Sequence, residues 1–100
     1  MRIGDVCEFK SGGPDCDFWI VRKGTEKSVG KPTKTYSPEY IGIKVTKKEL
    51  IVPEFLFYYF EYLNMIGVFS QLSTGTTNLK NIKISEVKDI PIQMQQNRSK

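Results

Sequence analysis

The sequence of 100 residues contains no histidine, only two cysteines and no long apolar run, and each shortage excludes a class of protein. Without histidine the chain cannot form a histidine-based catalytic triad or a Cys–His dyad, and it lacks the commonest transition-metal ligand. The spacing of Cys7 and Cys16 matches no zinc pattern. No apolar stretch approaches the ~20 residues that a membrane-spanning helix needs. Catalysis by carboxylates or lysine remains open to such a chain, but no motif supports it, so we expect no enzyme activity, no metal or other cofactor, and no membrane partner.

Signals for export are also missing, since Met1–Asp5 has no apolar segment of the kind that a signal peptide carries. A cytoplasmic protein is expected, in which both thiols stay free. A chain of this length forms one domain, which we place at residues 1–92, followed by a polar tail at residues 93–100. Fifteen Lys and Arg residues against eleven Asp and Glu give a net charge of +4. This excess permits binding to nucleic acid without requiring it.

Short runs rich in β-branched and aromatic residues predict a sheet. The expected extended segments lie at residues 3–9 (after a first turn), 17–22, 40–45, 78–84 and 89–92. Gly42, inside one of them, marks a bulge or a close approach. Polar loops are expected at residues 10–15 and 73–79. Ser85 is the expected N-cap of a short helix that runs through Lys88.

The strongest local signal is a helix from Pro53 to about Leu63, with a second helical segment as far as residue 72. Pro53 suits the first helical position, and the charge of Glu54 complements the helix dipole. Apolar and aromatic side chains follow at helical spacing, and their number predicts a helix covered on most sides. The fold class expected is α+β, a small mixed or antiparallel sheet packed against one main aromatic-rich helix at about 53–72.

Residues 23–35 are rich in lysine and poor in large apolar side chains, which predicts a mobile, exposed, basic loop. With Arg22 at its base, this loop could contact phosphates; the alternative is a solvated linker. The loop at 73–78 also has two interpretations. Its backbone and hydroxyl groups could contact phosphates, or the hydroxyl groups could form hydrogen bonds with the backbone of the loop itself. Asp15 and Asp17 flank Cys16, but their spacing supports neither a metal site nor a nuclease site.

Three stretches stand in a recognisable order. Residues 3–13 (IGDVCEFKSGG) give a hydrophobic-Gly-Asp start, a strand and then glycines. Residues 52–60 (VPEFLFYYF) give a proline-led aromatic helix. STGTTNL at 73–79, followed by IKISEVKDIPI at 82–92, gives a Gly-Thr-Thr loop, a short helix and a closing strand. Together they resemble the target-recognition domain of type I restriction–modification specificity subunits.

The resemblance implies the family's fold core and a role in binding duplex DNA. The chain would be a shortened copy that lacks the family's spacer helix, and such a copy would suit a phage or mobile element. Most of the length missing relative to the family lies before Pro53, where much of the DNA-reading surface would be. The side chains expected on DNA are Lys10, Arg22, Lys23, Lys27, Lys31, Lys34, Lys44, Thr76, Thr77 and Lys80.

The alternative is a protein–protein adaptor or inhibitor that uses the same fold without reading DNA. Its motivation is the surplus of aromatic residues on the Pro53 helix, which belong to a core or a partner surface rather than under stacked bases. Phe57, Tyr58 and Tyr62 are the expected interface, and the partner is either a second copy of the chain or a host protein.

Overall fold

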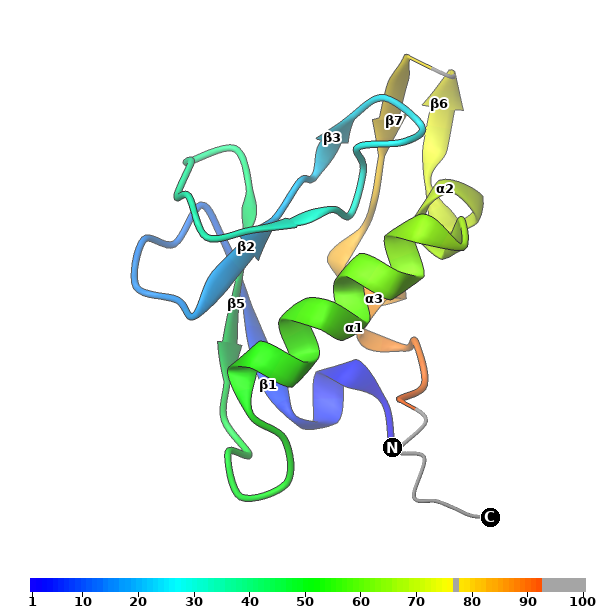
Figure 1. The fold of residues 1–100 in the computed structure, drawn as a ribbon. Helices are drawn as coiled ribbons and strands as arrows, with labels where there is room; N and C mark the ends of the chain where they lie inside the picture. Colours follow the sequence, from blue (N-terminus) through cyan, green and yellow to red (C-terminus); the bar gives the residue numbers. More distant parts are fainter. Residues whose placement is uncertain (77, 93–100) are drawn as a thin grey trace, which may run out of the picture.

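The computed structural model describes residues 1–76 and 78–92 as two antiparallel sheets with three α-helices (Figure 1). A four-stranded sheet has the order β1-β5-β2-β4 and a three-stranded sheet the order β3-β7-β6. The four-stranded sheet contains β1 (Cys7–Ser11), β2 (Phe18–Ile20), β4 (Pro32–Thr33) and β5 (Ile41–Val45). The three-stranded sheet contains β3 (Lys23–Gly24), β6 (Thr74–Thr76) and β7 (Leu79–Asn81). The helices are α1 (Pro53–Met65), α2 (Val68–Leu72) and α3 (Ile84–Lys88), preceded by a 3-10 turn, η1 (Ile3–Asp5). The predicted α+β class is confirmed, although the sheet is divided in two.

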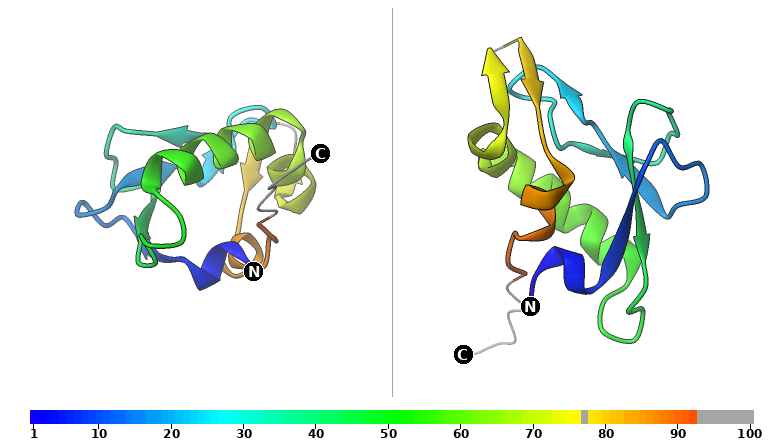
Figure 2. Two further views of the ribbon diagram at one scale, coloured as in Figure 1. Left: turned by 60° about the horizontal axis from the view of Figure 1, so that its bottom comes forward. Right: turned by 180° about the vertical axis from the view of Figure 1, so that it is seen from behind.

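The two ends of the described chain lie side by side (Figures 1 and 2). The Ile3 amide donates to the Ile90 carbonyl at 2.9 Å, and the Ile92 amide donates to the Met1 carbonyl at 2.8 Å. Side chains of Ile3, Ile90 and Ile92 are buried in the common core. The opening and closing motifs therefore form one body with the helix between them.

Helix α1 lies across one face of the four-stranded sheet (Figure 1). Its buried residues Leu56, Phe60 and Leu63 recur at helical spacing and face the core. The ring of Phe60 packs edge-on against Phe18 of β2, with centroids 5.6 Å apart, and also contacts the ring of Phe69 in α2. This aromatic cluster joins both helices to the sheet.

The prediction of one mobile, exposed loop at residues 23–35 is wrong. The segment contributes β3 and β4 and buries Val29 completely. The Gly30 amide donates to the Val21 carbonyl at 2.8 Å, and the Val21 amide donates to the Lys31 carbonyl at 3.1 Å. The single apolar side chain and these backbone hydrogen bonds fix the segment, while its lysines remain exposed.

Three smaller predictions also need correction. Ser85 is not an N-cap, because α3 begins at Ile84 with Lys83 as its N-cap, two residues earlier than predicted, and Val87 is buried in the core. The predicted polar loop at 73–79 includes β6, which pairs with β7 as a hairpin. Lys10 belongs to β1 rather than to a loop, because β1 pairs with β5 as far as Ser11.

The prediction that α1 is covered on most sides is wrong as well. The side chains of Tyr58 and Tyr62 are 64% and 54% exposed, and that of Met65 is 81% exposed. The helix buries only one face because a single sheet lies beneath it. A search of the described helices finds none with the length and apolar character to cross a membrane.

Candidate nucleic-acid interface

The register of β1 and β5 separates the charged side chains from the core. Side chains alternate between the two faces of a strand, so Cys7 and Val45, which are buried, face α1. Lys10 and Lys44 project from the opposite face, near the Cys16 thiol. The Lys44 ammonium lies 3.6 Å from an Asp15 carboxylate oxygen, and both side chains are largely solvent-exposed, so the pair contributes at most about 1 kcal/mol.

A second group of cations lies where the two sheets meet. Arg22 connects β2 to β3, and its Nη1 donates to the Ser11 hydroxyl at 2.8 Å. No carboxylate of the described residues lies within ion-pair distance of this guanidinium. Arg22 therefore keeps most of its donors free for a ligand.

These residues line an open cavity of about 350 Å³. Its walls are Ser11, Arg22, Lys23, Pro38, Glu39 and Asn81. Lys23 and Asn81 are directly paired across β3 and β7, which places their side chains on the same face of the three-stranded sheet. The Asn81 Oδ1 is buried and has no hydrogen-bond partner within the described parts of the chain. An unpaired buried acceptor costs about 1–3 kcal/mol, a penalty that a ligand donating a hydrogen bond would remove.

The cavity thus combines donors and acceptors. Arg22 and Lys23 donate, while Glu39 and Asn81 supply oxygen acceptors. A phosphate presents only acceptors, whereas the edge of a nucleobase presents donors and acceptors together. The cavity is therefore chemically suited to a base edge, with Lys23 in its wall suited to a phosphate.

Lys80 projects from the other face of β7, opposite Gly24, and Thr76 lies across from Leu79 in the same hairpin. The remaining predicted lysines are dispersed. The Lys34 ammonium lies 5.1 Å from the centroid of the Phe57 ring, and Lys27 and Lys31 are exposed on the 25–31 turn. Thr77 lies outside the described residues.

The structure therefore divides the residues predicted to bind DNA into separate groups rather than one continuous patch. It also adds Ser11, Glu39 and Asn81, which sequence reasoning missed. Ser11 and Asn81 belong to short strands whose pairing partners are distant in the sequence. Asn81 stands out as a candidate binding residue because its side-chain oxygen is buried without a hydrogen-bond partner, a feature that can be found only in the folded structure.

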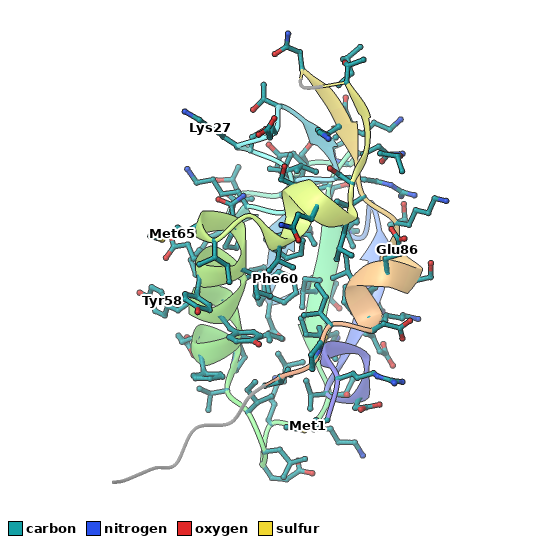
Figure 3. All side chains as sticks on the ribbon, turned by 90° about the vertical axis from the view of Figure 1, so that its right-hand side faces the viewer. Met1, Lys27, Tyr58, Phe60, Met65 and Glu86 are labelled. Carbon is teal, nitrogen blue, oxygen red and sulfur yellow. The ribbon has the colours of Figure 1, made fainter. Side chains whose placement is uncertain are left out.

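The predicted protein interface also divides. Phe57 is half-buried and packs edge-on against Phe18 with ring centroids 5.4 Å apart, so its ring belongs to the edge of the core. Tyr58 and Tyr62 are exposed on α1. Figure 3 shows Tyr58 and Met65 directed away from the sheet and Phe60 directed toward it.

The cysteines and their neighbouring carboxylates have structural roles. Burial raises the pKa of the Cys7 thiol to about 12, and burial also raises the pKa of the Cys16 thiol, so neither is an activated nucleophile. An Asp17 carboxylate oxygen accepts a hydrogen bond from the Val45 amide at 2.8 Å, which ties the loop before β2 to β5. Within residues 1–76 and 78–92, no cluster of three acidic, Cys or His side chains could hold a metal ion.

No protein-family model and no curated protein matches the chain. Among solved structures, the fold is similar to the S subunit of a type I restriction–modification system from M. genitalium, with a TM-score of 0.70. The two chains are 13% identical, and the match covers 90% of this chain and 32% of the S subunit. At this identity the likeness establishes the fold alone, and the chain spans about a third of the subunit's length.

Proposed function

We propose that the protein is a non-catalytic module that binds duplex DNA through the cavity at the junction of its two sheets. The observation that carries the proposal is the fold similarity to an S subunit over 90% of the chain. The target-recognition domains that the motif order in this sequence resembles bind duplex DNA, and the proposal carries that role over to this chain. The cavity supports the same function through its chemistry. Arg22 can donate hydrogen bonds to acceptors on the edge of a base, and the Asn81 Oδ1 can accept a hydrogen bond from a donor on that edge.

Affinity in this proposal comes from cations around the cavity. Lys23 and Lys80 project from opposite faces of one small sheet, so a duplex whose major groove takes the edge of this sheet would meet one lysine on each side. Thr76 of the same hairpin adds a hydroxyl contact to a phosphate oxygen. Lys27, Lys31 and Lys34 extend the basic surface along the 25–35 segment, and Lys10 and Lys44 contact DNA only where it bends toward the outer face of β1 and β5.

The test is a fluorescence anisotropy titration of a labelled random-sequence duplex at 50 mM salt and above. The double variant Lys23→Ala, Lys80→Ala should bind about tenfold more weakly than the wild type at 50 mM salt. The slope of log affinity against log salt should fall in magnitude by about 2, because each lost phosphate contact removes about one unit.

The matched control is Lys47→Ala, Lys48→Ala, which removes the same charge from an exposed turn after β5, at the opposite end of the molecule from β3 and β7 (Figure 1). This variant should retain the wild-type salt slope. Absence of wild-type binding at 50 mM salt refutes the proposal and favours the adaptor alternative. An equal loss in both double variants refutes the location.

A further inference from the structure

Helix α1 has a second apolar face on the side away from the core. Phe55, Tyr58, Tyr62 and Met65 are 43%, 64%, 54% and 81% exposed. Their spacing of three, four and three residues is that of the a and d positions that form the seam of a coiled coil. A stripe of this kind on a monomer is a surface to which another helix binds.

The stripe continues into an apolar groove of about 490 Å³. Tyr62 of α1 and Ile66, the C-cap of that helix, form one wall, and Leu72 of α2 and Ile90 complete the lining. The stripe and the groove share Tyr62, so they form one surface, which we call the helix-docking face.

The aromatic wall of this face is already ordered. The Tyr59 hydroxyl donates to the Pro91 carbonyl at 2.8 Å, which joins α1 to the closing segment. The Tyr59 ring stacks on Phe55 and on Tyr62, with centroids 6.2 and 6.3 Å apart. Preorganised rings lose little conformational entropy when a partner binds.

The groove end of this face is acidic, whereas Lys27 lies near Met65 at the other end, in the lining of a neighbouring pocket. Glu86 and Asp89 are the charged residues that line the groove, and the charged residues of α1 are Glu54 and Glu61. The ammonium of Lys88, in the last turn of α3, lies 6.0 Å from the Phe9 ring centroid and so is directed toward β1. The acidic border stands out on a chain whose net charge is +4.

We propose that this face docks one amphipathic α-helix of a partner protein, with an apolar seam flanked by Lys or Arg residues. The a/d stripe requires a helix, the groove takes its larger side chains, and the carboxylates select its charge. A second copy of α1 fits poorly, because it would bring Glu54 and Glu61 to an acidic border. Binding at this face is independent of DNA binding.

The test uses two fluorescein-labelled synthetic helical peptides of equal length with Leu at every a and d position. One carries Lys at the e and g positions, and the other carries Glu there. The full-length protein should bind the Lys peptide at least about tenfold more tightly in an anisotropy titration. The net charge of +4 by itself favours the Glu peptide, so this preference reports the local carboxylates.

Two variants locate the binding. The double variant Tyr62→Ala, Met65→Ala should bind the Lys peptide at least about tenfold more weakly than the wild type. The control Leu50→Ala, Leu79→Ala, which removes two exposed apolar side chains elsewhere, should bind it as tightly as the wild type. Glu86→Gln, Asp89→Asn should abolish the preference between the peptides. All the substituted side chains are exposed, so the fold is expected to persist.

Several results would overturn the proposal: no saturable binding of either peptide, equal binding of both peptides, or an equal effect of the two apolar double variants. A dimer in sedimentation equilibrium that Tyr62→Ala, Met65→Ala dissociates would also overturn it, since a second copy would then be the occupant. DNA titration of the same variants separates this result from the DNA-binding proposal.

Discussion

At the scale of single residues, two glycines hold the same left-handed conformation for different reasons. Gly30 has φ +82° and Gly67 has φ +85°. A Cβ at position 30 would meet the Phe69 ring and lie 2.7 Å from the Phe69 Cβ, whereas a Cβ at position 67 would meet no atom within 4 Å. Glycine is therefore needed at position 30 both for the left-handed backbone conformation and for packing against Phe69. At position 67 it is needed for the backbone conformation alone.

This difference predicts the cost of alanine at each position. Gly67→Ala should destabilise the protein by about 1–2 kcal/mol through backbone strain. Gly30→Ala should cost a further ~1–3 kcal/mol, because the new methyl group displaces Phe69 from the core. Urea denaturation of both variants measures the difference, and equal midpoints would contradict the role of packing at Gly30.

At the scale of elements, one side chain attaches the 25–31 turn to α1. The Asn64 amide nitrogen donates to the carbonyls of Lys27 and Val29, each at 3.0 Å. This turn follows β3 and leads into β4, so Asn64 links the helix to both sheets. Lys23, at the start of this segment, is placed beside Asn81 by the pairing of β3 with β7.

Asn64→Ala should therefore loosen one segment more than the whole molecule. The loss of two hydrogen bonds costs about 1–3 kcal/mol, so exchange of the Gly30 and Lys31 amides should accelerate at least about tenfold. Amides of β5 should change less in native-state hydrogen exchange. Gln71→Ala, on the exposed side of α2, is the control and should leave both sets unchanged. Uniform acceleration across β5 and the turn would contradict a local link.

At the scale of the whole molecule, stability depends on joining the two ends of the described chain. Arg2 and Pro91 form an antiparallel bridge, and α3 packs against η1. Because these contacts are distant in sequence, they form only when the entire domain has closed. Substitutions in the closing segment should therefore destabilise the domain as a unit.

Ile92→Ala should reduce the free energy of unfolding by about 2–4 kcal/mol, since Ile92 is buried and its truncation leaves a cavity. Urea unfolding followed by tryptophan fluorescence should remain a single transition with an unchanged slope, because Trp19 reports on the distant four-stranded sheet. Leu79→Ala, which truncates a side chain that is 75% exposed, should change stability by less than about 0.5 kcal/mol. A stable Ile92→Ala protein would show that the ends contribute little.

The sequence by itself determined the elements whose signals are local. Pro53, Glu54 and the spacing of Leu56, Phe60 and Leu63 define α1, and short runs of aromatic and β-branched residues define β2 and β5. The order of the three motifs also indicated the overall fold. These features were predictable because helical periodicity and turn chemistry act over a few neighbouring residues.

Only the tertiary structure decided which side chains share a surface. Arg22, Lys23 and Asn81 meet because β3 pairs with β7, whose residues are far away in the chain. The lysines of residues 23–35 belong to a fixed segment because Val29 and Asn64 hold it, not because of their own composition. Likewise, aromatic residues occur on both faces of α1, so the sequence does not show which face is buried. Tyr58 and Tyr62 are exposed because one sheet covers one face of the helix. Non-local strand pairing and the number of covering layers are properties of the whole chain, which no short window of sequence contains.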